Sequence, residues 1–181
     1  IGKKISPKKI FNNYFYHSSY SSSFLKHAEN FVNDVVKEID FTKNNLIFEI
    51  ASNDGYLLKN FDKNKYKLVG IEPSANVAEI AQKSGVNTEN LFFNISSSKI
   101  LKKKYGTPRL IIANNVLAHV PSIKTFFKAL DIISSDETFI SIEFPSVKNL
   151  INYNQFDTIY HEHYTYLSLT TVKIILKNFP F

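Results

Sequence analysis

Ten residues near the end of the chain gather side chains that can move protons. The stretch from Asp157 to Tyr166 has the sequence DTIYHEHYTY and contains two histidines, a glutamate and three tyrosines. Histidine changes charge near neutral pH, and carboxylates and phenols beside it can accept, donate or orient a proton. This stretch therefore predicts a site of general acid–base chemistry.

The backbone of this stretch decides which of these groups can act together. In an extended strand, His161 and His163 would lie on one face, and Tyr160, Glu162 and Tyr164 would lie on the other. A loop would impose no such alternation. The structural alternative is an aromatic surface strand whose histidines only bond backbone groups, because a cluster of titratable groups does not by itself prove a site.

The same two histidines could also be ligands of a metal ion. The chain has no cysteine, no His-Glu-x-x-His motif and no third ligand at a diagnostic spacing. We therefore expect no metal site.

Two short apolar runs, each followed by polar residues, indicate a nucleoside site. Residues 46–50 form the first run, a turn-rich ASNDG follows at 51–55, and a helix is expected to open at Tyr56. The second run, residues 68–71, ends in Glu72 and Pro73. An acid at this place in a βαβ unit binds two ribose hydroxyls of a nucleotide. Gly55 is the only glycine of the loop, so a ribose without a pyrophosphate fits this unit better than a dinucleotide.

Apolar runs and helical patterns alternate along the remaining chain. A serine at 21–23 caps a helix that reaches residue 39, and further helices are expected near 76–84, 97–105, 123–133 and 169–176. Strands are expected near 91–93, 110–113 and 138–143. Five strands alternating with helices predict an α/β fold with a doubly wound, mostly parallel sheet and right-handed crossovers. Ligands of such sheets bind beyond the carboxyl ends of the strands, where residues 49–55, 72, 114–119 and 143–144 fall.

The start of the chain divides into two parts. Residues 1–12 are basic and have no clear periodicity, which predicts a loosely structured lead-in. Residues 14–20, with the sequence YFYHSSY, either cover the core or form a lid whose phenols, or His17, reach the site. We therefore treat residues 1–22 as a lead-in and possible lid, and residues 23–181 as one domain.

The composition agrees with a single folded domain. The 181 residues are 44% hydrophobic and 14% aromatic, enough for a compact core and against disorder. No apolar run reaches about 18 residues and the lysine-rich start lacks a signal-peptide core, so we expect a soluble, cytoplasmic protein without a membrane partner. The absence of cysteine excludes disulfides and thiol chemistry from these residues.

The charge and the missing methionine lead to two further expectations. The net charge of +6 is mostly spread over separate lysines and no nucleic-acid-binding motif is present, so no nucleic-acid partner is expected. The chain contains no methionine. We therefore expect it to be part of a longer protein.

Five segments together resemble the class I S-adenosylmethionine-dependent methyltransferases. Within that class they are similar to the sugar C-methyltransferases that act on nucleotide-linked deoxy-keto sugars. The segments are EIASNDG (49–55), GIEPS (70–74), ANNVLAHV (113–120), EFP (143–145) and QFDTIYHEH (155–163). The resemblance implies S-adenosyl-L-methionine as cofactor and a small-molecule acceptor, a nucleotide-linked sugar.

The resemblance also implies roles for individual residues. The residues expected to bind the cofactor are Glu49, Ala51 and Gly55 near its methionine part, Glu72 at its ribose, and Asn114 and Asn115 beside its amino-acid portion. Asn53 and Pro73 are also expected to bind it. The residues expected to act on the acceptor are Tyr16, His119, Tyr160, Glu162 and His163. Members of this family carry a cysteine-rich zinc module before this domain and another domain after it, and the fold normally has two more strands; none of these is in the sequence.

The chemistry of carbon methylation needs the same types of group. A carbon next to a ketone becomes nucleophilic when a base removes its proton and a donor stabilises the enolate oxygen. His163 is the better base, Glu162 could orient it or take the proton itself, and Tyr16 or Tyr160 could bond the oxygen. Because the methyl group is already activated on its sulfonium, placement accounts for much of the remaining rate.

Other interpretations of the sequence stay open. His119 could simply bond backbone groups, as buried polar side chains usually do. A Rossmann-type oxidoreductase would also use an acid after the second strand, but its first turn is rich in glycine, where this chain has Ala51 and Asn53. A non-catalytic binding module or remnant is the third possibility.

Overall fold

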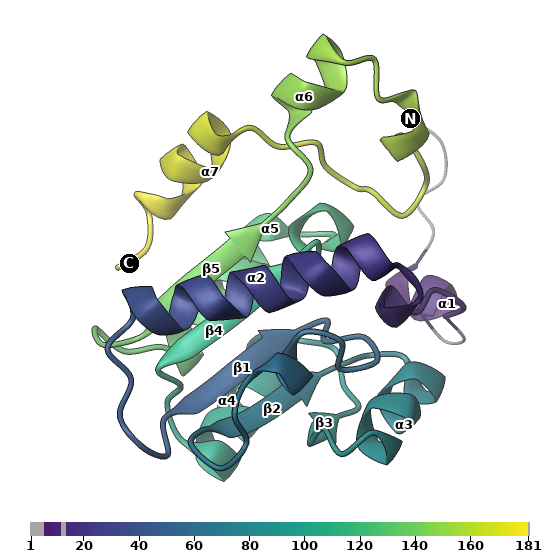
Figure 1. The fold of residues 1–181 in the computed structure, drawn as a ribbon. Helices are drawn as coiled ribbons and strands as arrows, with labels where there is room; N and C mark the ends of the chain where they lie inside the picture. Colours follow the sequence, from purple (N-terminus) through teal and green to yellow (C-terminus); the bar gives the residue numbers. More distant parts are fainter. Residues whose placement is uncertain (1–5, 12–13, 181) are drawn as a thin grey trace.

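The computed structural model describes residues 6–11 and 14–180 and contains a parallel sheet of five strands. The strands are β1 (Leu46–Ile50), β2 (Lys67–Ile71), β3 (Thr88–Glu89), β4 (Leu110–Asn114) and β5 (Phe139–Glu143), in the spatial order β3-β2-β1-β4-β5. All four pairs are parallel. The strand order reverses between β1 and β4 (Figure 1), and sheets of this kind bind ligands at such a reversal.

Helices cover both faces of the sheet. The longer ones are α2 (Ser22–Glu38), α3 (Ala75–Lys83), α4 (Ile95–Tyr105), α5 (Ile123–Ile133) and α7 (Leu169–Leu176); α1 (Pro7–Phe11) and α6 (Val147–Asn152) are short. Single 3-10 turns lie at η1 (Ser18–Tyr20), η2 (Leu58–Asn60), η3 (Leu117–His119) and η4 (Phe156–Thr158).

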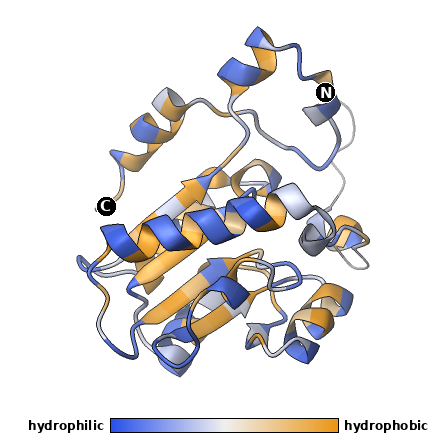
Figure 2. Cartoon of the chain, in the orientation of Figure 1, coloured by the Kyte–Doolittle hydropathy of each residue, from blue (hydrophilic) through white to orange (hydrophobic). Residues whose placement is uncertain are grey.

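The core is split by the sheet into two apolar layers. Phe48 and Ile50 of β1 pack with α4, α5 and α7, whereas Ile47, which precedes Phe48, packs with α2 and α3. Successive strand residues point to opposite faces, so a strand covered on both sides is mostly apolar, and Glu49 is the exception in β1. Figure 2 shows this as strands that are largely hydrophobic, while α2 carries hydrophilic residues along its exposed side. The expected doubly wound α/β fold is confirmed.

The third strand is not where the sequence placed it. It lies at Thr88–Glu89, where Gly70 N–H donates to the Asn87 carbonyl and Glu72 N–H donates to the Glu89 carbonyl. The apolar run 91–93 has left the sheet, and Phe93 packs edge-on against Phe126 with ring centroids 5.6 Å apart. The run was mistaken for a strand because its residues are apolar, although here they are half-buried and two of them line a cavity.

Two other local predictions were wrong. The helix expected to open at Tyr56 is only the turn η2, because the Asn60 side chain donates to the carbonyl oxygens of Tyr56 and Leu57 and so occupies acceptors that a longer helix would use. The lead-in is not loose throughout, since Pro7–Phe11 is a helical turn with proline at its first position. Residues 1–5 and 12–13, the rest of that lead-in, lie outside the described residues.

Residues 157–166, for which the sequence predicts acid–base chemistry, form the end of η4 and a loop rather than a strand. The alternation of faces expected for a strand therefore does not apply to it. None of the helices in the described parts of the chain is long and apolar enough to cross a membrane.

Candidate active site

The loop after β1 has a backbone that ordinary residues rarely adopt. Ala51, Asn53 and Gly55 all have positive φ angles, of 57°, 49° and 79°. The N–H groups of Ala51 and Ser52 both donate to the carbonyl of Ile71, at 2.8 and 3.2 Å, which ties this loop to the end of β2. Left-handed backbone outside glycine stores strain and is common at ligand sites. Ala51 and Asn53 therefore adopt backbone angles that glycine would favour, although neither residue is glycine.

Glu72 lies at the end of β2 and is 3% exposed. Its Oε2 accepts the N–H of Asn53 at 3.0 Å and its Oε1 accepts the N–H of Ser74 at 2.8 Å. Burial raises the pKa of this carboxyl, and the two backbone hydrogen bonds act in the opposite direction. Each carboxylate oxygen can accept a second hydrogen bond, so both remain available to ribose hydroxyls.

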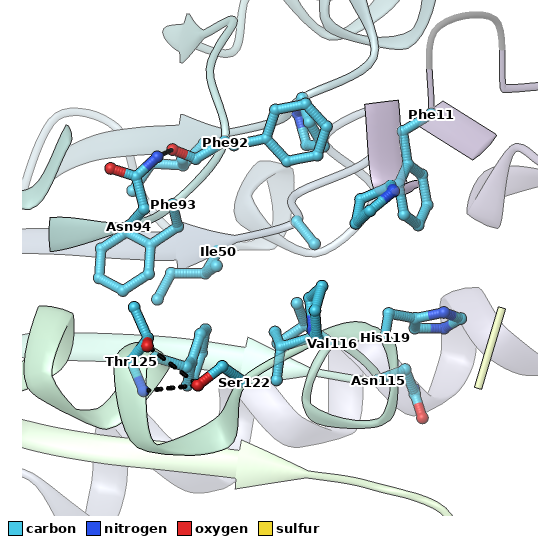
Figure 3. Close-up of a pocket in the computed structure, with 17 residues that line it drawn as sticks. Phe11, Ile50, Phe92, Phe93, Asn94, Asn115, Val116, His119, Ser122 and Thr125 are labelled. Carbon is cyan, nitrogen blue, oxygen red and sulfur yellow. Dashed lines mark hydrogen bonds between the residues drawn. The ribbon is translucent and has the colours of Figure 1, made fainter. Parts of the chain in front are cut away.

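Two adjoining cavities lie beyond the carboxyl ends of β1, β2 and β4, and Ala51, Pro73, Asn115 and His119 line both of them. The first, of about 340 Å³, is mainly apolar (Figure 3). Its walls come from several elements and include Phe11, Ile50, Phe92, Phe93, Val116 and Phe126. Aromatic and aliphatic walls suit a flat heterocyclic base.

The second cavity, of about 400 Å³, is more polar. It brings together most of the predicted site residues, namely Tyr16, Ala51, Asn53, Glu72, Pro73, Asn114, Asn115, His119, Tyr160 and His163. Asn114 is buried and its Oδ1 has no hydrogen-bond partner among the described residues. Because a buried acceptor without a donor is costly, this oxygen fits a ligand that supplies an N–H or O–H.

Three predicted residues do not line the second cavity, and Glu49 is the most deeply buried of them at 1% exposure. Burial, followed by the charges of Glu72 and Asp54, raises the pKa of Glu49 well above its usual value. Its Oε2 has no partner among the described residues. Glu49 therefore lies beneath the loop instead of forming a cavity wall.

Gly55 and Glu162 are the other two. A Cβ atom added to Gly55 would meet Cγ2 of Val86 at 2.7 Å, so the close approach of Val86 is one reason that this position requires glycine. Glu162 contributes its backbone: its carbonyl lies 3.1 Å from Nδ1 of His119.

His163 is held in one tautomer by the backbone. Its Nδ1 lies 2.8 Å from the carbonyl oxygen of Thr158, and a carbonyl can only accept, so Nδ1 carries the proton and Nε2 of the neutral ring is an acceptor. The ring centroid lies 4.0 Å from that of Tyr160 and 4.7 Å from that of His119. The geometry thus presents a basic nitrogen within an aromatic cluster.

His119 follows the same rule with a different consequence. Its Nδ1 donates to the Glu162 carbonyl, so it does bond backbone, as the structural alternative proposed, but it also lines both cavities. Burial and the neighbouring His163 lower the pKa of His119 to about 4. His119 is therefore neutral at physiological pH.

Several residues at the site were missed by sequence analysis. Tyr14 and Thr158 line the second cavity. Nε2 of His27, on α2, lies 2.6 Å from Oε2 of Glu143, whose Oε1 accepts from the Asn115 side chain at 3.0 Å. The alternation of Tyr14 with Tyr16 was a usable signal for Tyr14. No local pattern points to His27.

The reversal of strand order, the buried acid after β2 and the adjoining apolar cavity define a nucleoside-binding enzyme with a doubly wound sheet. A family model described as a methyltransferase domain matches residues 24–181, and the chain belongs to this family.

Known proteins agree with this class. The C-methyltransferase NovU of Streptomyces niveus is 31% identical over 165 residues, which cover 91% of this chain and 39% of NovU. The chain thus spans about two-fifths of the length of that relative. Among solved structures, the plantazolicin methyltransferase BpumL, in complex with a monoazolic desmethylPZN analog and SAH, superposes with a TM-score of 0.66 at 17% identity. The match covers 86% of this chain and 62% of the BpumL chain. The CurJ carbon methyltransferase superposes with a TM-score of 0.61 at 14% identity, and the match covers 89% of this chain and 49% of the CurJ chain.

The cofactor of this methyltransferase domain is S-adenosylmethionine. The site fits this cofactor on its own geometry, with an apolar cavity for the adenine, Glu72 for the ribose and the unpartnered Asn114 oxygen for the amino group. When bound, the cofactor supplies a methyl group that is already activated on sulfur.

Proposed function

We propose that the enzyme methylates a carbon next to a ketone in a nucleotide-linked deoxy sugar, through base-assisted enolate formation. The observation that carries this proposal is the position of His163. Its ring lines the cavity that also contains Glu72 and Asn53 of the cofactor site, with Nε2 as the acceptor. Oxygen and nitrogen nucleophiles often need only weak base assistance, whereas carbon requires removal of a C–H proton.

Donors for the enolate oxygen are present around the same cavity. Tyr14, Tyr16 and Tyr160 all line it. Burial and the charge of Glu162 raise the pKa values of Tyr14 and Tyr160, which keeps both phenols protonated and able to donate. A preorganised O–H donor at a developing oxyanion is an effective contribution to catalysis.

The acceptor class is supported by the walls of the second cavity. They combine aromatic rings with neutral polar side chains and Glu72, and no lysine or arginine is among the described lining residues. We propose that the keto-sugar ring enters here, stacked on tyrosine, while residues 14–22 close over it and the domain at 23–181 binds the cofactor. The name of the relative NovU, a C-methyltransferase, favours carbon over oxygen as the methylated atom.

The alternatives have less support. The oxidoreductase hypothesis rested on the acid after β2, which methyltransferases share, and the family match does not favour it. A non-catalytic remnant would not need to preserve a histidine tautomer and an unpartnered amide oxygen inside one cavity.

The proposal is tested by incubating the protein with a nucleotide-linked deoxy-keto sugar and cofactor carrying a ¹³C-labelled methyl group. The product spectrum should contain a methyl bound to carbon. His163→Asn should lower turnover by about 100-fold, the usual share of general acid–base catalysis, with little change in cofactor affinity. His161→Asn is the matched control, because His161 is exposed on the same loop and lines neither cavity. A methyl bound to oxygen or nitrogen would contradict the proposal.

A further inference from the structure

Residues 14–19, which we call the strap, are held by side chains of the cofactor-binding loops. Asn53 donates from Nδ2 to the carbonyl of Tyr16 at 3.1 Å, and its Oδ1 accepts the N–H of Ser18 at 2.9 Å. Asn76, in the first turn of α3, donates to the carbonyl of Tyr14 at 2.7 Å and accepts its N–H at 3.3 Å. These contacts join residues 35 to 62 positions apart, and the strap precedes residue 24, where the family match begins.

The two contacts of Asn53 reproduce the pairing of a parallel β-strand. A strand residue bonds the carbonyl before and the N–H after the residue it faces on a parallel neighbour. The carboxamide of Asn53 bonds the same two groups on either side of His17. The carboxamide carries its donor and its acceptor on two separate atoms, an arrangement that neither aspartate nor alanine provides.

The backbone of Asn53 points in the other direction, toward the cofactor. Its N–H donates to Oε2 of Glu72, the acid placed for the ribose. Asn53 is 8% exposed and has a φ of 49°, so its position is tightly defined by the loop. A ribose hydroxyl that donates to Glu72 would restrain the carboxylate that also accepts the backbone N–H of Asn53. Cofactor binding would thereby restrain the loop whose Asn53 side chain bonds the strap.

The strap also reaches the acceptor side. The side chains of Tyr14 and Tyr16 line the second cavity together with Tyr160 and His163, and the rings of Tyr14 and Tyr16 lie 6.4 Å apart. A further contact comes from Asp54, whose Oδ2 accepts from the N–H and the hydroxyl of Ser19. The acceptor-side tyrosines therefore depend on side chains of the loop that follows β1.

We propose that Asn53 is a positioning residue that couples the cofactor site to the strap, so that Tyr14 and Tyr16 take their places when the cofactor loop is set. The enzyme then binds its cofactor before its acceptor. The consequence for catalysis rests on the proposed role of the strap tyrosines in the acceptor site. The coupling itself can be measured without any acceptor.

The test is amide hydrogen exchange over residues 14–20, with and without S-adenosylhomocysteine. In the wild type, the ligand should slow exchange at Ser18 by about tenfold or more, because one to two hydrogen bonds become more persistent. In Asn53→Ala this effect of the ligand should disappear. Asn53→Asp keeps the acceptor for Ser18 but loses the donor to Tyr16, so it should retain part of the protection that the ligand gives Ser18. This variant keeps the test decisive if the alanine variant does not fold.

Two control variants separate coupling from simple anchoring. Asn76→Ala should speed exchange at Tyr14 in both states while the ligand still protects Ser18. Asn60→Ala, which removes a half-buried amide bonded only within its own loop, should behave as the wild type. Ligand-independent exchange of the strap in the wild type would overturn the proposal, as would full ligand protection of Ser18 in Asn53→Ala. Neither outcome bears on which atom of the acceptor is methylated, so the two proposals can fail separately.

Discussion

Replacing Glu72 should damage both the fold and the cofactor site, and the structure allows the two effects to be separated. Its carboxylate accepts the backbone N–H groups of Asn53 and Ser74 at 3.0 and 2.8 Å, and it is 3% exposed. In Glu72→Ala both N–H groups lose their partner in a buried place. An unsatisfied buried donor costs about 1–3 kcal/mol, so the variant should be less stable by about 2–6 kcal/mol.

Glu72→Gln should lie between the wild type and the alanine variant. The glutamine oxygen can accept one of the two N–H groups, while its amide donor faces the other, so about 1–3 kcal/mol is lost. Part of this loss is offset because glutamine removes a carboxylate whose pKa burial has raised. Glu79→Ala is the matched control, because Glu79 is an exposed residue of α3 paired only with Lys83; it should change stability by less than about 0.5 kcal/mol.

The assay combines urea unfolding with calorimetric titration. Unfolding gives the stability loss directly, provided that the slopes against urea stay equal. Cofactor affinity is then measured where each variant is folded, and loss of the ribose hydrogen bonds should weaken it by a further 1–3 kcal/mol, about 5- to 150-fold. A Glu72→Ala protein with wild-type stability and affinity would refute the assignment of this residue.

Three other predictions concern Gly55, Glu49 and His119. Gly55→Val should destabilise the protein by about 1–3 kcal/mol, because residue 55 has a positive φ and its new Cβ would lie 2.7 Å from Val86. In urea unfolding, adding Val86→Ala should recover part of this loss. Lost cofactor binding with unchanged stability would contradict this prediction. Glu49 binds its proton more tightly in the folded state, so the stability of the wild type should fall as pH rises above the usual carboxyl pKa of 4.5 and through the raised pKa of Glu49. The melting temperature of Glu49→Gln should depend less on pH. Parallel pH profiles of the two proteins would contradict this prediction. The His119 ring should titrate with a midpoint near pH 4 in an NMR titration, and a midpoint near 6.5 would show that burial does not control it.

The sheet could be predicted because its central strands are buried on both faces. The run 110–113, and the run 46–50 apart from Glu49, are therefore apolar. Because parallel strands end at the same edge of the sheet, the sequence also predicts that Glu72, Asn114 and Asn115 lie close together, and all three line the second cavity. The same rule failed for residues 91–93, where an apolar run lines a cavity beside Phe126 instead of joining the sheet.

The contacts that shape the site were beyond sequence analysis because they depend on the folded chain. The tautomer of His163 follows from the carbonyl of Thr158 on a loop of irregular geometry. The clamp of Asn76 on Tyr14 joins residues 62 positions apart. The left-handed backbone of Ala51 and Asn53 could not be predicted either, because glycine is the residue that normally adopts it.

Proton exchange at the acceptor carbon tests the central claim most directly. The wild type is incubated in deuterated buffer with a nucleotide-linked deoxy-keto sugar and S-adenosylhomocysteine, which cannot donate a methyl group. If the site forms an enolate, the α-proton should be replaced by deuterium, His163→Asn should slow this by about 100-fold, and His161→Asn should leave it unchanged. Equal exchange in the wild type and His163→Asn would contradict the role of His163 as the base, and no exchange in the wild type would contradict enolate formation itself.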